Sequence, residues 1–386
     1  MCENDIKGEV ESAVRVSLCG PNLKGNELRY VSDAIKSQWV SNGNYITSLE
    51  KAICSYVGIK GTVACQSGTS GIHLSMIALG IREGDEVIVP TVAFIAAVNP
   101  VRYVGAYPVF MDCDNSLCMD PEKLEEFLNY ECVFDGNILV NKATNRIIKA
   151  IIVVHVFGNL GNMDKILELA KLFKLKLVED ATEALGSYYV HGPLKGKYAG
   201  TMGDIGVFSF NGNKIITTGG GGAVVSNDNR LLEKIRFLSG QAKNDPLYFV
   251  HDEIGYNYRM SNIQAAIGLG QIEQIEKFIE IKNKNYEIYK KFGIELLPFN
   301  DQIRSNKWFY AHLTRKRKDL INYLLKSGVE VRPLWMLVHL QKCYCKFQSY
   351  KIEKARYFLE RIVNLPCGTD LCKSSLMHVV DLLKKF

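Results

Sequence analysis

The first two thirds of the chain alternate short hydrophobic runs with longer stretches in which apolar and polar residues recur at helical spacing. The short runs are rich in Val, Ile and Phe, which favour strands. They predict strands at 62–65, 86–89, 107–111, 149–154, 176–178, 205–210 and 223–226. The amphipathic stretches predict helices at 70–79, 94–104, 121–129, 163–173 and 230–237. Because crossover helices connect parallel strands, we expect a mostly parallel sheet covered by helices on both faces.

The pattern changes from about residue 256 onward. One long helix is predicted at 261–290, followed by two shorter helices at 317–326 and 350–362 and by weak strands near 295–297 and 329–331. We therefore predict an α/β protein with two domains. Residues 1–250 form a large domain with an N-terminal arm, and residues 251–386 form a smaller α/β domain.

The composition is that of an ordinary globular protein, with 386 residues, 47% hydrophobic and 23% charged. The net charge of +6 argues against a strongly basic nucleic-acid-binding protein, and it is compatible with an enzyme for an anionic small molecule. The longest uncharged stretch, 87–101, is shorter than the ~18 residues of a membrane span. The acidic N-terminus lacks the apolar segment of a signal peptide, so we expect a cytoplasmic protein.

The eleven cysteines are irregularly spaced, and Cys343 and Cys345 have no second pair that would complete a zinc site. We expect reduced thiols and no metal.

Candidate chemistry follows the predicted strands, because ligands of open α/β sheets bind at the carboxyl ends of the strands. The segment 66–71, rich in Gly, Ser and Thr, lies between a strand and a helix. Amide groups and the dipole at a helix N-terminus suit a phosphate. Simple N-capping by Ser67 or Thr69 is the alternative.

Three further residues point toward a cofactor. Asp180, next to Glu179 at the end of a strand, is either a solvated acid or the partner of a cation such as a pyridinium nitrogen. Lys214 precedes four consecutive glycines and is either a surface lysine or a reactive amine. Phe94 is either a core residue or an aromatic that stacks on a ring. With the phosphate segment, these are the components of a pyridoxal-phosphate site.

The chain resembles the DegT/DnrJ/StrS aminotransferases, which are fold-type-I enzymes that use pyridoxal 5'-phosphate on nucleotide-linked keto-sugars. The resemblance extends from about Ser17 to Pro366. It is carried by SGTSGIHL at 67–74, GDEVIVP at 84–90, VHVFG at 154–158, EDATEALGS at 179–187, GDIGVFSF at 203–210 and GYNYRM at 255–260.

The resemblance assigns roles residue by residue. Lys214 matches the Schiff-base lysine and Asp180 the acid that keeps the pyridine nitrogen protonated. The remaining matches to cofactor contacts are Thr69, Ser70 and Ser209 at the phosphate, Phe94 over the ring, Glu183 beside the ring hydroxyl, and Asn257 or Arg259 at the phosphate of the neighbouring subunit. Candidates for the sugar-nucleotide pocket are Trp308, Arg332 and His339, each of which could instead be structural.

Within the family, the segments 208–218, 305–308 and 331–335 resemble enzymes that aminate C4 of UDP-linked 4-keto-6-deoxy-N-acetylhexosamines, on the bacillosamine and legionaminic acid routes. L-Glutamate is the implied amino donor, and a homodimer with shared active sites is the implied assembly. Three alternatives stay open: a GDP-4-keto-6-deoxymannose aminotransferase similar to the perosamine synthases, a sugar dehydratase, and a non-catalytic regulator. The relatives that act as dehydratases replace the lysine with His, so Lys214 favours amino transfer.

Overall fold

The computed structural model describes residues 16–386. The acidic start of the chain, and with it the beginning of the predicted N-terminal arm, lies outside these residues.

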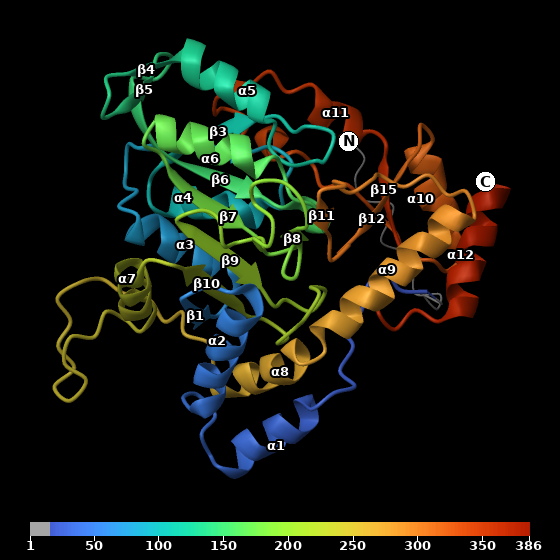
Figure 1. Ribbon diagram of the computed structural model, residues 1–386, viewed down its shortest axis with the longest axis horizontal. Helices are drawn as coiled ribbons and strands as arrows, with labels where there is room; N and C mark the ends of the chain where they lie inside the picture. Colours follow the sequence, from blue (N-terminus) through green and yellow to red (C-terminus); the bar gives the residue numbers. More distant parts are fainter. Residues whose placement is uncertain (1–15) are drawn as a thin grey trace.

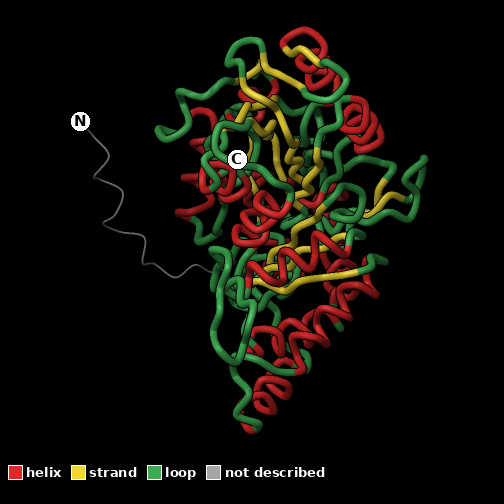
Figure 2. Tube along the Cα trace, turned by 90° about the vertical axis from the view of Figure 1, so that its left-hand side faces the viewer, coloured by secondary structure: helices red, strands yellow, loops and turns green. Residues whose placement is uncertain are grey.

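A ten-stranded mixed sheet runs through the molecule (Figures 1 and 2). Its main path is β1 (Gly61–Cys65), β10 (Gly222–Ser226), β9 (Ile205–Ser209), β7 (Lys176–Asp180), β6 (Arg146–Val154), β2 (Glu86–Pro90), β3 (Tyr107–Met111) and β14 (Ser349–Tyr350). The strands from β9 to β14 pair in parallel, whereas β10 is antiparallel to both of its neighbours. A short antiparallel branch, β4 (Cys132–Phe134) and β5 (Leu139–Asn141), joins β6. All seven predicted strands are confirmed.

Helices cover both faces of this sheet, as predicted. One core contains α3 (Gly68–Ala78), α4 (Asn99–Tyr103) and α7 (Asn229–Ser239). The other contains α2 (Asn44–Val57), α5 (Pro121–Glu126) and α6 (Met163–Leu172). Neighbouring strand residues alternate between the cores: Val87 and Val89 belong to the first and Ile88 to the second. This alternation is the period of two that side chains follow along a strand.

The predicted helix 261–290 is wrong as a single element. It is two helices, α8 (Asn262–Ile272) and α9 (Ile275–Lys291). Glu273 and Gln274 separate them, and the side-chain amide of Gln274 donates to Glu27 Oε1 at the start of α1 (Glu27–Lys36). The helix α8 packs against α1 and α2, which lie far from it in the sequence. The break between α8 and α9 therefore coincides with a long-range contact.

Beyond α9, a three-stranded antiparallel sheet forms from β12 (Tyr310–Leu313), β15 (Ile362–Leu365) and β13 (Arg332–Pro333). The elements near it are α10 (Arg317–Lys326) and α12 (Lys373–Lys385) (Figure 1). The expected strands 295–297 and 329–331 are wrong, because each pairs through a single bridge, Leu296 with His312 and Val329 with Val16. A separate two-stranded pair joins β8 (Tyr188–Tyr189) and β11 (Ile303–Arg304). The division at residue 250 stays a prediction.

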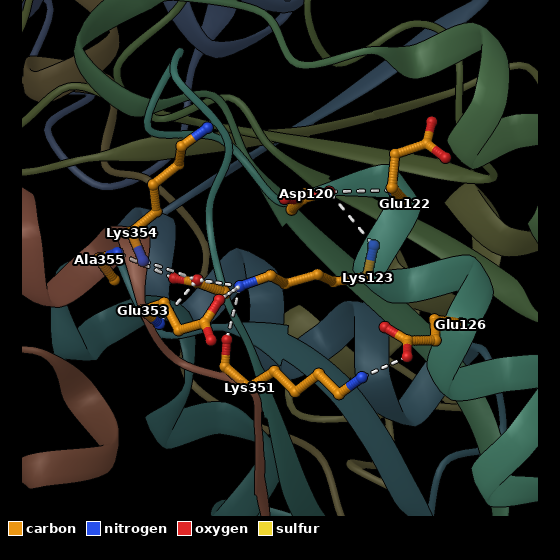
Figure 3. A network of polar contacts seen from close by, with 9 residues as sticks. Asp120, Glu122, Lys123, Glu126, Lys351, Glu353, Lys354 and Ala355 are labelled. Carbon is orange, nitrogen blue, oxygen red and sulfur yellow. Dashed lines mark hydrogen bonds and ion pairs between the residues drawn. The ribbon is translucent and has the colours of Figure 1, made fainter.

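A polar network explains why the predicted helix 350–362 shortens to α11 (Lys354–Leu359) (Figure 3). The buried carboxylate of Asp112, just beyond β3, accepts the backbone N–H groups of Glu353, Lys354 and Ala355, each at 2.9 Å. Lys123 Nζ lies 2.8 Å from the same carboxylate. The start of α11 is therefore fixed by a residue more than 200 positions away.

Candidate active site

A cavity of about 760 Å³ lies at the carboxyl ends of β6, β7 and β9 and at the N-terminus of α3. Its walls also include residues near β13 and β15 of the C-terminal part. Eight of the candidates from the sequence line it: Thr69, Phe94, Asp180, Glu183, Ser209, Lys214, Trp308 and Arg332. Tertiary structure thus brings together residues spread over more than 260 positions.

The first wall is the N-terminus of α3. Ser67 caps this helix, and its hydroxyl accepts the N–H of Ser70 at 3.0 Å. Gly71 N–H donates to the Ser67 carbonyl. These bonds leave the N–H groups of Gly68 and Thr69 without an acceptor among the described residues, as is usual in the first turn. Capping and anion binding are therefore compatible, because they use different amides.

The N-terminus of α3 is also tightly packed at Gly68. A Cβ atom at Gly68 would lie 2.9 Å from Thr182 Cγ2 and 3.1 Å from Ser209 Cβ. Only glycine fits here, so the N-terminus of α3 can pack closely against Thr182 and Ser209, beside the ends of β7 and β9.

The two acids at the end of β7 have different surroundings. Glu179 is fully buried, pairs with His155 Nε2 at 2.8 Å and accepts N–H groups of the loop 200–203. Asp180 points to the opposite face, as strand alternation requires, and lines the cavity. Burial raises the pKa of Asp180, and among residues 16–386 no cation lies within ion-pair distance of it. A buried acid of this kind suits a cationic ligand.

Lys214 is held over an aromatic ring and beside an acid. Its Nζ lies 4.1 Å from the ring centroid of Trp308 and 3.8 Å from Glu183 Oε1. Trp308 Nε1 donates to the Asn213 carbonyl at 2.7 Å and so fixes the loop that carries the lysine. Burial raises the pKa of Glu183 to about 7, although the nearby Lys214 ammonium opposes this. Glu183 also accepts the N–H of Phe157 at 2.8 Å.

Phe94 and Trp335 form an aromatic wall with ring centroids 6.3 Å apart. Phe94 is 54% exposed despite its size, which leaves one side of its ring open to a ligand. It precedes the short helical turn Ile95–Ala97, so the predicted helix 94–104 is interrupted here.

Four candidates do not line the cavity. The Ser70 hydroxyl is used inside the α3 cap, where it donates to the Ser67 carbonyl. His339 is buried and shares a hydrogen bond with Thr91. Asn257 is exposed, and Arg259 lies beside the end of β1, where its carbonyl accepts from Gln66.

The lining residues that the reasoning from sequence missed include Cys19, Glu330 and Asn364. Asn364 lies in β15 opposite Arg332, and its buried Oδ1 has no hydrogen-bond partner among the described residues. No local pattern marks these positions, because each reaches the cavity only through tertiary packing.

The residues of the cavity fit pyridoxal phosphate. The end of α3 with Thr69 and Ser209 could hold the phosphate, Asp180 the ring nitrogen and Phe94 a ring face, with the Lys214 amine within the same cavity.

The model of the DegT/DnrJ/EryC1/StrS aminotransferase family matches residues 21–384. The chain belongs to this family. It is 39% identical over 375 residues to the GDP-perosamine synthase of Escherichia coli O157:H7, covering 95% of this chain and 97% of that protein. It is 30% identical over 390 residues to the UDP-4-amino-4,6-dideoxy-N-acetyl-beta-L-altrosamine transaminase of Campylobacter jejuni subsp. jejuni serotype O:23/36, covering 94% and 97%. The crystal structure of a DegT DnrJ EryC1 StrS aminotransferase from Brucella abortus has a TM-score of 0.86 and 25% identity, covering 94% and 95%.

As a member of this family, the protein is a sugar-nucleotide aminotransferase that uses pyridoxal phosphate. When bound, this cofactor supplies an electron sink for the charge that develops when a proton leaves carbon. Among the lining residues of the described chain, Lys214 is the only lysine. No group of three or more His, Cys, Asp or Glu residues in 16–386 is arranged to hold a metal ion. No helix in this part is long and apolar enough to cross a membrane.

Proposed function

We propose that this aminotransferase transfers the amino group of L-glutamate to C4 of a nucleotide-linked 4-keto-6-deoxy sugar. The observation that carries the proposal is that one cavity unites the Lys214 amine, the buried Asp180 carboxylate and the open amides at the end of α3. Each group matches one part of the cofactor, so the amine lies near the reacting carbon.

In this proposal, the Lys214 amine would accept the proton that leaves the donor's α-carbon and later give it up, acting first as a base and then as an acid. Asp180 holds the ring nitrogen protonated, which its buried, otherwise unpaired carboxylate favours. Trp308 and Glu183, which would lie beside the ring hydroxyl of a bound cofactor, hold the amine in place.

The names of the relatives favour GDP over UDP as the nucleotide. Relatives that are 39%, 35% and 34% identical are named GDP-perosamine synthases, whereas those named for UDP-linked altrosamine are 30% and 29% identical. The expectation from sequence gave UDP first. We now put GDP-4-keto-6-deoxymannose first and the UDP-linked N-acetylhexosamine second.

A substrate panel tests the proposal directly. Purified enzyme with glutamate is offered GDP- and UDP-linked 4-keto-6-deoxy sugars, and 2-oxoglutarate and the amino sugar are measured. Equal amounts of both products with one sugar are expected. Ammonia release in place of an amino sugar, with 2-oxoglutarate still formed, would indicate a dehydratase. A protein that binds no cofactor would indicate a non-catalytic role.

We further propose that Arg332 and Asn364 form part of the sugar-nucleotide subsite. Arg332, the other cationic side chain of the cavity wall besides Lys214 in the described residues, suits a phosphate oxygen. The unpartnered Asn364 Oδ1 needs a donor, which a sugar hydroxyl supplies and a glutamate carboxylate does not. Asn364→Leu should weaken binding of the sugar nucleotide by roughly tenfold in calorimetry. The KM for glutamate should stay unchanged. A rise in both the dissociation constant of the sugar nucleotide and the KM for glutamate would argue against this assignment.

We also propose a homodimer with shared active sites. The segment after α7 projects from the body of the molecule (Figure 1) and exposes Leu247, Tyr248, Phe249, Val250 and Ile254. Contiguous exposed apolar side chains are typical of an interface. Because Asn257 and Arg259, just beyond this segment, do not line their own cavity, a second copy of the chain is the partner that would give them a role at the phosphate.

Hybrid dimers test the shared site. Lys214→Ala chains are mixed with chains that carry substitutions at both Asn257 and Arg259. If the donors act across subunits, one site of each hybrid has an intact lysine and intact donors. Each hybrid dimer then has up to about half of the activity of a wild-type dimer. If chain exchange is verified and no activity returns, the donors act within their own chain.

A further inference from the structure

A buried lysine lies behind the catalytic cavity without a carboxylate partner. Lys282 of α9 is 1% exposed, and its Nζ donates to the carbonyls of Cys367 at 2.7 Å and Trp308 at 3.0 Å. No Asp or Glu among residues 16–386 lies within ion-pair distance of it. A buried ammonium is costly unless an anion is close. The Lys282 Nζ atom also lies 4.0 Å from Cys19 Sγ.

Cys19 is accessible from the cavity, whereas Cys367 lies behind it. Cys19 lines the cavity wall that also carries Lys214, and its Sγ is 3.7 Å from the Asn213 carbonyl of the lysine loop. Cys19 and the Lys214 amine therefore face the same cavity.

Cys367 is the second thiol of the same cluster. It is fully buried, and its Sγ lies 3.3 Å from the Trp308 carbonyl that also binds Lys282. A backbone bond from Cys367 N–H to the Leu18 carbonyl, 2.7 Å long, holds the two cysteine-bearing segments together. The two thiols thus share one ammonium and one carbonyl as neighbours.

The surroundings make the two thiols chemically unequal. A hydrogen bond from the Cys367 thiol and the Lys282 ammonium lower the pKa of Cys19 from 9.0 to about 6, against the effect of burial. Burial raises the pKa of Cys367 well above 9. The more accessible sulfur is therefore the better nucleophile, and the buried sulfur remains a thiol.

We propose that Cys19 and Cys367 are a peroxide-reactive thiol pair that forms a disulfide beside the catalytic cavity. The Cys19 sulfur attacks one peroxide oxygen, the O–O bond breaks, and hydroxide leaves and takes up a proton to become water. Cys19 is then a sulfenic acid. The Cys367 sulfur attacks it, an S–S bond forms, and the departing hydroxide takes the Cys367 proton as a second water. Two thiols lose two electrons, and hydrogen peroxide gains them.

Peptide mass spectrometry of the holoenzyme tests this proposal. After brief treatment with hydrogen peroxide and alkylation of the remaining thiols, we expect a peptide pair joined through Cys19 and Cys367 and lighter by two hydrogen atoms. Dithiothreitol should reverse the cross-link. Cys345→Ser, at an exposed cysteine outside the cluster, is the matched control and should give the same pair.

Two variants separate the steps. Cys367→Ser removes the second thiol but keeps a hydroxyl donor, so dimedone should trap a sulfenic acid at Cys19. Cys19→Ser should give neither product. In the wild type, alkylation of Cys19 by iodoacetamide should reach its plateau near pH 7. If peroxide oxidises Cys343 while Cys19 stays reduced, or if Cys19 pairs with another cysteine, the proposal is wrong.

Discussion

Glu183→Gln tests the electrostatics of the cavity through the stability of the cofactor-free protein. Burial raises the pKa of Glu183 from 4.5 to about 7 in the folded chain. The folded state therefore holds this proton more tightly than the unfolded state does. The resulting stability is fully present below pH 4.5 and is lost as the pH rises through about 7. The difference between the two pKa values corresponds to about 3 kcal/mol.

Glutamine keeps an oxygen that accepts the Phe157 N–H but carries no charge. The free energy of unfolding of the Glu183→Gln variant, relative to the wild type, should thus increase by up to about 3 kcal/mol between pH 4.5 and pH 8. With an unfolding entropy of ~2.1 cal/mol/K per residue, a chain of 386 residues gains about 4 °C in melting temperature from this. Differential scanning calorimetry at both pH values measures the gain.

The exposed Glu122→Gln is the matched control, and its melting temperature relative to the wild type should change little between the two pH values. In a Lys214→Ala background the transition should move to higher pH, because the ammonium that favours the carboxylate is gone. A difference between wild type and Glu183→Gln that stays constant from pH 4.5 to pH 8 would refute the reasoning.

Three further substitutions address the proposed chemistry. Lys214→Ala should abolish transamination and leave the circular dichroism spectrum unchanged. In the wild type, borohydride should label Lys214, and a label on another lysine would overturn the assignment. Asp180→Asn should retain the cofactor but slow turnover by orders of magnitude, because an amide cannot hold the ring nitrogen protonated, and near-normal turnover would exclude it as the partner. Trp308→Phe removes the hydrogen bond to the Asn213 carbonyl, which contributes about 1 kcal/mol. We expect kcat to fall several-fold with little change in either KM. An unchanged kcat would show that the lysine loop does not need this bond.

The sequence by itself determined the elements whose signal is local. Buried strands such as 107–111 and 149–154 are runs of apolar residues, apart from Lys149 at the start of the second. They form where predicted, because a strand covered on both faces needs apolar side chains on both. The motifs around Asp180 and Lys214 likewise pointed to residues that line one cavity, since each motif lies at or shortly after the carboxyl end of a strand.

Tertiary structure alone decided the features that depend on distant partners. The break between α8 and α9 coincides with a contact between Gln274 and Glu27, and α11 begins where the Asp112 carboxylate binds its first amides. The unpartnered Asn364 oxygen and the pairing of Cys19 with Lys282 are equally invisible in the sequence. Local periodicity records which face of an element is buried. It does not record which residue, hundreds of positions away, is packed against that face, and the pKa values and hydrogen bonds of the cavity depend on that packing.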